Sequence, residues 1–566
     1  MTGKKGIDSE EKKDVHWADN IAEVVRERAA TDPILKKVVK EKGYIVYDEK
    51  TPSGKIHIGA GRGWVIHDSI AKAMRDKGMK AKFILSSDDM DPFDKMNKDL
   101  DPSFKKYLGV PFRDIPSPVK GYKSFADYYF SECVEKFDEF GIEAEIQSTG
   151  AAYEKGWFNR TIKIALDNAD KIQEIYSRFS RKGSIGTKRI PFNPICEKCG
   201  RIGTTYAYEW DPVREVVKYR CEPKLVEWAE GCGHEGEASP YNGGGKFPWK
   251  VEWAAKWPTI GVAVETAGKD HFTYGGSRTV AVAISDEVFD YPPPYPSTRK
   301  ETGSGYEFFT IGGKKMSTSK GRGVSFADMT DYAPASLLRY LLVKTRPHAV
   351  IDFDPVGTNK IILLYEAYDR TERIYYGTET VANRKEEEHE KRVYELSHVG
   401  KVRKTMPSQI PFTFAAALVQ ICSEPSGALD TLLRTGHVDK SISKEDKLYV
   451  TERLNYAKKW VTEFAPDEYK FIVNKAVPEE SRKKIGKTEL MALKMFQKKI
   501  AQGKEFTEDE HMEIIKGIIT ELDMKPKAFF AAAYLALLNK EHGPKLATLI
   551  NMIGQKETAE ILRSLS

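Results

Sequence analysis

The sequence predicts an α/β fold, in which a nucleotide-binding sheet carries a cysteine-bearing insertion and is followed by an all-α C-terminal region. Three observations predict it. A buried strand, a glycine-bearing loop and a helix with an apolar face follow one another between residues 43 and 78. Four cysteines gather between residues 196 and 232, and from about residue 400 onward the apolar positions recur at helical spacing.

The first half of the sheet is predicted from a βαβ pattern. The run Gly43–Tyr47 is apolar and rich in β-formers, and the loop TPSGKIHIGAGRG at Thr51–Gly63 follows it. Apolar positions then recur at helical spacing up to Gly78, and Ala81–Ser86 predicts a second strand. A loop at a helix N-terminus suits anions, because free backbone N–H groups and the helix dipole point outward there.

A first motif, HIGA at residues 57–60, lies in that loop. His57 can donate to a phosphate as charge moves onto a leaving pyrophosphate. Gly54 and Gly59 let the backbone approach a nucleotide closely. A single histidine in such a place is more often structural than catalytic, so the motif gains its meaning from its partner downstream.

That partner is a second motif, KMSTS at residues 315–319. Lys315, on a loop after two glycines, can neutralise the β- and γ-phosphates of a nucleotide, while Ser317 and Ser319 donate hydrogen bonds. Taken alone, Lys315 would be a solvated charge in a turn. With both motifs present in this order, a catalytic role in phosphate chemistry is the favoured interpretation.

The pair resembles the ATP-handling signatures of class I aminoacyl-tRNA synthetases, with Ala60 in place of a second histidine and Thr318 in place of a lysine. Longer segments resemble the archaeal-type class I lysyl-tRNA synthetases: Ser86–Pro92, Pro248–Trp257, Gly261–Ser277, Arg346–Pro355 and Ala536–Ile550. The resemblance implies a Rossmann-like catalytic domain. It also implies that lysine is activated with ATP and transferred to the terminal adenosine of tRNA(Lys), with release of pyrophosphate and AMP.

The resemblance implies site residues as well. Trp249 and His271 match residues that contact the amino acid, and Asp270 matches the acid that binds the ATP ribose, with Gly268 fitting a close backbone approach. Tryptophans recur every four residues at Trp249, Trp253 and Trp257, so they share one side of a helix. Core packing is the alternative for two of the three.

Three acids, Asp88, Asp89 and Asp91, follow the second predicted strand, where open α/β sheets bind ligands. They could face the substrate ammonium, orient loops, hold Mg²⁺ through water, or form a helix N-cap cluster. Asp89 is the one assigned here to lysine binding.

A zinc site is predicted from the cysteines. Cys196 and Cys199 have the spacing of a zinc knuckle, and Cys221 and Cys232 follow, with His234 as an alternative to either of the last two. A closed four-ligand site would hold together a segment too small to form its own core. A vestigial site and a redox-active cysteine pair are the rival interpretations.

Composition bounds the rest. The chain of 566 residues is 40% hydrophobic, which suits several domains, and its mean hydropathy of −0.50 with no long apolar run argues against a membrane span. The N-terminus, MTGKKGIDSEEKKD, lacks an apolar core and is rich in acids, so neither a secretory signal nor a transit peptide fits, and a cytoplasmic location is expected. The net charge of +6 is compatible with a nucleic-acid partner without requiring one.

The expected organisation is a disordered leader at 1–14, a catalytic domain at 15–330 that includes an insertion at 105–250, a helical connecting region at 331–400 that contacts the tRNA stem, and an α-helical anticodon-binding domain at 401–566. Lysines at Ser481–Lys487 and Phe496–Lys499 offer phosphate contacts, although scattered surface lysines are common. A monomer is favoured.

Three rival functions remain at this point. One is a ligase of the same fold that needs no tRNA, such as a pantothenate-synthetase-like enzyme. Another is a glutamyl- or cysteinyl-type synthetase, and the last is an RNA-binding paralogue that has lost catalysis.

Overall fold

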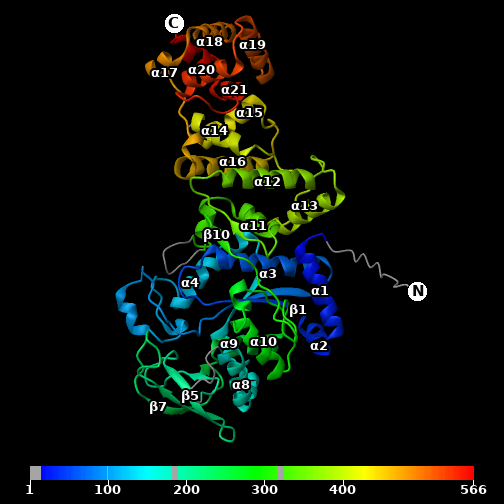
Figure 1. Ribbon diagram of the computed structural model, residues 1–566, viewed down its shortest axis with the longest axis vertical. Helices are drawn as coiled ribbons and strands as arrows, with labels where there is room; N and C mark the ends of the chain where they lie inside the picture. The colour runs from blue at the N-terminus through cyan, green and yellow to red at the C-terminus, as the bar shows by residue number, and fades with distance from the viewer. Residues whose placement is uncertain (1–14, 99, 181–188, 316–323, 423, 566) are drawn as a thin grey trace, which may run out of the picture. The chain divides into compact units, whose positions relative to one another are not determined.

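A computed structural model describes residues 15–98, 100–180, 189–315, 324–422 and 424–565 (Figure 1). The chain divides into two compact units. The first holds residues up to 331 together with 335–353 and 380–402, and the second holds 332–334, 354–379 and 403–566. Each unit therefore takes part of the predicted connecting region at 331–400. The predicted leader at 1–14 lies outside the described residues.

The first unit is built on a four-stranded parallel sheet in the order β3-β2-β1-β9. Its strands are β1 (Tyr44–Lys50), β2 (Ala81–Ser87), β3 (Ala144–Ser148) and β9 (Val262–Val264). Between β1 and β2 the chain forms α3 (Ile58–Asp76), which is buried along most of its length. The predicted βαβ unit is therefore present, with its glycine-bearing loop between β1 and α3.

Two further helices, α1 (Trp17–Thr31) and α2 (Pro33–Lys42), precede the sheet, and α1 packs against α3. Asp32 begins α2 by accepting hydrogen bonds from the N–H groups of Ile34 and Leu35, and proline occupies the first helical position. Gly43, with φ of 79°, ends α2 and directs the chain into β1.

The predicted insertion, residues 105–250, also contains β3, an edge strand of the central sheet. Its helices are α4 (Phe125–Val134), α5 (Phe137–Phe140), α6 (Thr149–Glu154), α7 (Asn159–Asp167) and α8 (Ala169–Phe179). Short breaks separate α4 from α5 and α7 from α8. The second break is at Asn168, whose φ of −115° leaves the helical region while its side chain bonds the Ile164 carbonyl.

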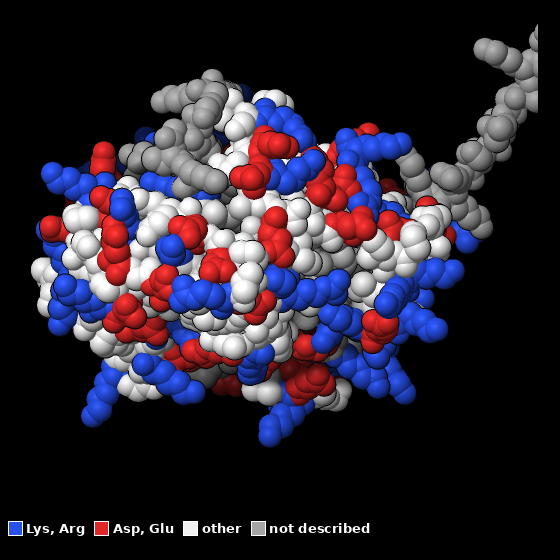
Figure 2. All heavy atoms as spheres, turned by 90° about the horizontal axis from the view of Figure 1, so that it is seen from below, with Lys and Arg blue, Asp and Glu red and all other residues white. Residues whose placement is uncertain are grey.

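The cysteine segment is a small antiparallel sheet of β5 (Thr205–Asp211), β6 (Val216–Cys221) and β7 (Glu235–Ala238), with β4 (Asn193–Pro194) paired to β8 (Gly245–Lys246) beside it. Cross-strand ion pairs join its basic residues to acids: Lys218 to Glu209, Arg214 to Glu237 and Arg220 to Glu235. Figure 2 shows basic and acidic side chains interspersed in the same way across the face in view.

Further helices and strands complete the first unit. They are α9 (Trp249–Lys256), α10 (Ser277–Glu287), β10 (Phe309–Ile311), β11 (Lys314–Lys315), α11 (Ala335–Lys344), β12 (Ile351–Asp352) and α13 (Arg384–Ser397). With strand β9, the chain returns to the central sheet after the insertion.

The second unit is helical throughout the part that the structure describes. It contains α12 (Lys360–Tyr375), α14 (Phe412–Cys422), α15 (Pro425–Thr435), α16 (Lys444–Lys459), α17 (Glu479–Lys484), α18 (Lys487–Ile500), α19 (Glu508–Glu521), α20 (Pro526–Leu538), α21 (Leu546–Ile553) and α22 (Gln555–Arg563). Thr507 and Glu510 form a capping box at the start of α19. Among the described residues, none of the helices combines the length and apolar character that crossing a membrane requires.

Candidate active site

A cavity of about 270 Å³ opens at the carboxyl end of β1. Open α/β sheets bind ligands at this edge. Six of the residues predicted from the sequence line the cavity together: His57, Gly59, Trp249, Gly268, Asp270 and His271. They come from the loop before α3, from α9 and from the loop after β9, so the fold brings three distant segments to one place.

The first motif is held by the segment that follows the second one. His57 occupies the N-cap position of α3 and pairs with Ser325 across an antiparallel bridge. The Ile58 N–H donates to the Val324 carbonyl at 3.2 Å, and the Phe326 N–H donates to the Ile56 carbonyl at 2.8 Å. The chain on either side of the first motif is therefore fastened to the chain just beyond the second.

The second motif begins on a hairpin of β10 and β11. Gly312 and Gly313, with φ of 56° and 72°, form its tight turn, a backbone conformation that favours glycine. The Asp352 carboxylate accepts from the Gly313 N–H at 2.7 Å and from the Thr310 hydroxyl at 2.9 Å. This brace positions the strand that ends at Lys315. Two residues predicted for this motif, Ser317 and Ser319, lie outside the described residues.

Aromatic rings form one wall of the cavity. The rings of Trp249 and Trp253 stack with centroids 5.1 Å apart, and His271 meets Trp253 edge-on at 5.4 Å. Trp253 and Trp257 are buried, as the core-packing interpretation expects, whereas Trp249 remains half-buried. Burial lowers the pKa of His271, so its ring is neutral at physiological pH.

Two carboxylates at the end of β1, Asp48 and Glu49, also line the cavity. Asp48 lies 3.3 Å from the ring of His67, and its side chain is 16% exposed. Glu49 bonds the Lys256 ammonium through Oε2 at 2.5 Å, while its Oε1 is buried without a hydrogen-bond partner among the described residues. Neither acid is among the residues predicted from the sequence, although acidic residues directly after a buried strand were a usable signal.

Gly63, which has no side chain, leaves room beside Asp48. A Cβ at Gly63 would lie 2.6 Å from the Tyr306 hydroxyl and 3.2 Å from the Asp48 carboxylate. Glycine at this position therefore lets the carboxylate and the hydroxyl share one corner of the cavity. Tyr306 lines the cavity too and is half-buried.

Comparison with known proteins agrees with this geometry. Residues 15–400 match the family described as tRNA synthetases class I (K), and residues 452–565 match the family described as anticodon binding domain. The chain belongs to the class I lysyl-tRNA synthetase family.

Relatives cover almost the whole chain. The lysine–tRNA ligase of Methanocaldococcus jannaschii is 32% identical over 96% of this chain and 98% of its own length. That of Picrophilus torridus is 33% identical over 89% of this chain and 93% of its own. A solved glutamate–tRNA ligase from Elizabethkingia meningosepticum aligns with a TM-score of 0.42 at 12% identity, covering 92% of this chain and 99% of that one.

A buried network of lysine and carboxylate side chains lies next to the cavity. Lys256 donates hydrogen bonds to Glu49 and Asp88, both at 2.5 Å. Lys246 donates to Asp91 and forms an ion pair with Glu252 at 2.7 Å. Burial lowers the pKa of Lys256, but the carboxylates of Asp88 and Glu49 outweigh it and hold that pKa well above its usual range. Four carboxylates thus face two ammonium groups.

Two predicted residues lie apart from the cavity lining. The carboxylate of Asp89 accepts from the Ser148 hydroxyl and from the Gly150 N–H, at 2.5 and 2.8 Å, so it braces the start of α6. Gly54 lies where a Cβ would come within 2.6 Å of the Asn97 amide, which makes it a packing glycine of the loop.

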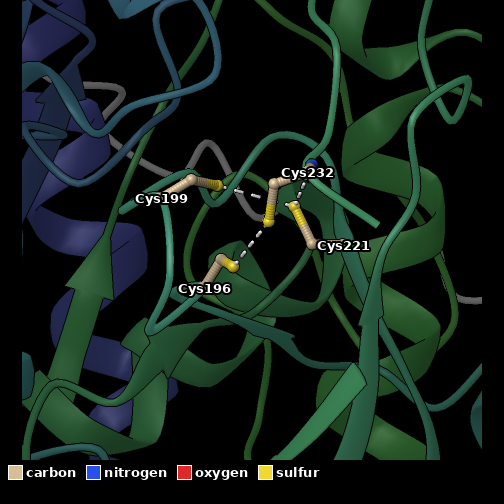
Figure 3. A group of neighbouring side chains, drawn as sticks. All are labelled: Cys196, Cys199, Cys221 and Cys232. Atoms are coloured by element: carbon tan, nitrogen blue, oxygen red, sulfur yellow. Dashed lines mark hydrogen bonds between the residues drawn. The ribbon is translucent and has the colours of Figure 1, made fainter. Parts of the chain in front are cut away.

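The four predicted cysteines of the insertion converge (Figure 3). Sulfur atoms of Cys196 and Cys232 are 3.6 Å apart, those of Cys199 and Cys221 are 3.7 Å apart, and all four lie within 4.8 Å of one another. In a tetrahedral zinc site with Zn–S bonds of about 2.3 Å, sulfur atoms are about 3.8 Å apart. The thiols therefore fit a zinc ion, whereas the ring of His234 contacts Glu197 at 2.7 Å.

Proposed function

We propose that this chain is a lysine–tRNA ligase, which activates lysine with ATP and transfers it to tRNA. The observation that carries the proposal is the cavity at the end of β1. There His57 and Gly59 of the first motif meet Asp270, His271 and two carboxylates suited to a cationic amino acid. Membership of the class I lysyl-tRNA synthetase family supports the same activity.

The reaction proceeds in two displacements. A carboxylate oxygen of lysine attacks the α-phosphorus of ATP, a new P–O bond forms, and the bond to the bridging oxygen breaks as pyrophosphate leaves. A ribose hydroxyl at the 3′ end of tRNA then attacks the lysyl carbonyl, loses its proton, and AMP leaves. Because no bond to the protein is needed, the enzyme contributes position and charge stabilisation. Mg²⁺ bound by the phosphates would neutralise part of their charge.

The nucleotide side of the site is assigned to the two motifs and to the loop after β9. His57 and Lys315 stabilise the pyrophosphate, with Gly59, Ser317 and Ser319 contributing close backbone approach and hydrogen bonds. Gly268 and Asp270 receive the ribose. A Cβ at Gly268 would project into open space, so packing does not require glycine there, and the position is suited to ligand contact. We assign the remaining phosphate charge, in the absence of a second motif histidine, to Lys50, which also lines the cavity.

The lysine side of the site is assigned to Asp48, Glu49 and Tyr306, with Trp249 and His271 along the wall. Lysine brings two ammonium groups, and we assign them to the carboxylates of Asp48 and Glu49 at the end of β1. Burial, with a smaller contribution from the adjacent Asp88 carboxylate, raises the pKa of Glu49 well above its usual range. The buried network has four carboxylates but two ammonium groups. An ammonium group of lysine bound in the cavity would add a third cation, and the unpaired Oε1 of Glu49 would accept a hydrogen bond from it. We assign Asp89 to holding the start of α6 in place and not to direct contact with lysine.

The cysteine cluster is assigned a structural Zn²⁺. Thiolates are the ligands zinc prefers in closed sites, and the four thiols leave no position for substrate. Cys196, Cys199, Cys221 and Cys232 would hold the ion, and the small β5–β6–β7 sheet would depend on it for stability.

The tRNA partner engages more than the catalytic cavity. We assign residues 401–566 to the anticodon, residues 331–400 to the stem of the tRNA, and the insertion at 105–250 to its acceptor end. Support for the first assignment is the family match at 452–565. The chain is proposed to act as a monomer in the cytoplasm.

The first experiment is aminoacylation of total tRNA with each of the twenty amino acids, run beside pyrophosphate exchange with and without tRNA. Charging with lysine alone is expected. Charging with glutamate or cysteine would overturn the amino-acid assignment. Exchange without any charging would favour a ligase that needs no tRNA, and inactivity in both assays would favour a paralogue without catalysis.

A further inference from the structure

His67, a residue of α3, is a buried polar side chain that the reaction itself does not use. Its ring is fully buried and stacks on Phe83 of β2, with ring centroids 5.7 Å apart and planes 13° from parallel. Both ring nitrogens have partners, and these partners come from two segments that line the catalytic cavity. The ring therefore joins parts of the site that are distant in the sequence.

One ring nitrogen faces the carboxylate assigned to lysine. Nδ1 of His67 lies 2.7 Å from the Gly63 carbonyl oxygen and 3.3 Å from Oδ2 of Asp48. Because both neighbours are acceptors, Nδ1 carries a proton and donates to the Gly63 carbonyl. The positive end of the same N–H lies beside the Asp48 carboxylate and favours one position of that carboxylate at the end of β1.

The other ring nitrogen faces the loop after β9, to which the ATP ribose is assigned. The Thr266 N–H donates to Nε2 of His67 at 2.9 Å, and the Thr266 hydroxyl lies 3.3 Å from the same atom. A backbone N–H can only donate, so Nε2 is the acceptor and the neutral ring carries its single proton on Nδ1. Thr266 is buried, so loss of this acceptor would be costly for its N–H.

The neutral form of the ring makes both contacts. Burial disfavours a charge on His67, but the Asp48 carboxylate and the Gly63 carbonyl outweigh burial and raise the pKa of the ring. A proton added at Nε2 would remove the acceptor of the Thr266 N–H and leave the Nδ1 donor in place. Variants of the ring are therefore best compared at alkaline pH, where the neutral form is favoured.

Thr266 leads directly into the nucleotide side of the cavity. The Ala267 carbonyl accepts from the Tyr306 N–H at 2.9 Å, and the Lys269 N–H donates to the Tyr306 carbonyl at 3.0 Å. Asp270 follows at once and lines the cavity. The loop is thus fastened to the imidazole at its start and to Tyr306 further along, so a shift at Thr266 would displace Asp270.

We propose that His67 is a positioning residue, which holds the lysine-binding carboxylate of Asp48 and the ribose-binding loop that begins at Thr266 in register with each other. The proposal rests on the lysine–tRNA ligase function, because it adds a residue to the site assigned to that reaction. His67 is not among the residues that line the cavity, so it acts through its neighbours and not by contact with substrate.

Two conservative variants divide the contacts of the ring. His67→Asn can place an amide N–H near the position of Nδ1, which keeps the donor beside Asp48 but does not reach Thr266. His67→Gln can place its amide oxygen near the position of Nε2, which keeps the acceptor for Thr266 but lacks the donor at Nδ1. Ser69→Ala is the matched control, since it removes a buried hydroxyl of the same helix that donates to the Val65 carbonyl at 2.7 Å.

Steady-state lysylation at alkaline pH measures the KM for each substrate. His67→Asn is expected to raise the KM for ATP about tenfold, which corresponds to about 1.4 kcal/mol, and to change the KM for lysine less than about threefold. His67→Gln is expected to do the reverse. Ser69→Ala should leave both constants unchanged, whatever it costs in melting temperature. Equal rises of both constants in the two His67 variants would overturn the proposal, because a merely structural role predicts that result.

A binding measurement separates this inference from the proposed activity. Titration calorimetry of the wild-type protein and both His67 variants with ATP alone, and with lysine alone, needs no turnover. Weaker ATP binding by His67→Asn and weaker lysine binding by His67→Gln are expected, and unchanged affinities in both variants would overturn the inference. Wild-type protein whose variants show the expected pattern but which never lysylates tRNA would refute the activity alone.

Discussion

Phe326 occupies the space that a side chain at Gly61 would need: a Cβ there would lie 2.1 Å from Cδ2 of the ring. The ring is fully buried and packs on Trp64 and Phe140, with centroids 5.1 and 4.3 Å away. From the sequence, Gly54 and Gly59 of the same loop are expected to allow close approach of a nucleotide. For Gly61 the structure gives a different reason, since the residue lets the chain beyond the second motif close against the first.

Gly61→Ala is therefore expected to destabilise the first unit by about 1–3 kcal/mol, as overpacking does, and to lower the rate of lysine activation. The measurement is thermal unfolding together with pyrophosphate exchange. Adding Phe326→Leu should restore part of both quantities by making room for the methyl group. A single Gly61→Ala variant with wild-type stability and activity would show that the ring moves aside at no cost.

Replacing His57 or Lys315 by alanine should each slow adenylate formation by at least about a hundredfold, because removal of one transition-state donor costs about 3–4 kcal/mol. Binding of tRNA should change little. Pyrophosphate exchange in the presence of tRNA measures the rate, and filter binding measures the affinity. His348→Ala, an exposed histidine of the same unit, is the control. Rates within a few-fold of wild type would refute the phosphate assignments.

Asp48→Asn and Asp270→Asn should weaken the binding of different substrates, lysine in the first variant and ATP in the second. Loss of a charge-assisted hydrogen bond costs about 1.5–3 kcal/mol, so Asp48→Asn should raise the KM for lysine by about tenfold to a hundredfold and leave the KM for ATP almost unchanged. Asp270→Asn should do the reverse. Steady-state kinetics with each substrate varied in turn is the measurement, and the same pattern in both variants would contradict the assignment.

The zinc content of variants shows whether the four cysteines or His234 bind the metal. Purified protein should carry about one zinc per chain, and Cys199→Ser should lose it, because a closed site needs all four ligands. His234→Gln should keep the metal, since His234 contacts Glu197 and lies outside the cluster. Metal analysis and proteolysis of the insertion are the measurements. Protein without metal after reducing purification, or zinc loss in His234→Gln, would refute this assignment.

Acid should weaken the fold through His16. Its Nδ1 accepts from the Ala18 N–H at 3.2 Å and begins α1. Burial, with smaller contributions from His389 and Arg392, lowers the pKa of His16 to about 3 from its usual 6.5. The unfolded chain therefore takes up this proton first, and stability falls as pH drops below 6.5.

Between pH 7.5 and 5.5 this effect amounts to about 1.4 kcal/mol. His16→Asn keeps a capping oxygen but cannot titrate, so its unfolding free energy should fall less over that interval by this amount. Urea unfolding at the two pH values measures the difference, with His542→Asn, an exposed histidine, as the control. Parallel losses in wild type and His16→Asn would contradict the prediction.

Much of the candidate site follows from local patterns. A strand, a loop and a helix next to one another are enough to place His57 and Gly59 at an anion-binding helix start, and cysteine spacing is enough to predict a metal cluster. Asp48 and Glu49 were not predicted as site residues, because the predicted strand ends one residue before Asp48, whereas β1 continues to Lys50. Ser317 and Ser319 lie outside the described residues, so their roles stay predictions.

The sequence by itself determined the βαβ unit, the helical C-terminal region and the family, because these depend on periodicity and on contiguous motifs. Which side chains meet across long separations became apparent from the folded structure alone. It joined β3 of the predicted insertion to the central sheet, set Lys246 and Lys256 against the acids after β2, and brought four thiols together while His234 contacts Glu197. The physical reason is that partners for buried charge and space for a side chain depend on residues hundreds of positions apart, as Gly61 and Phe326 show.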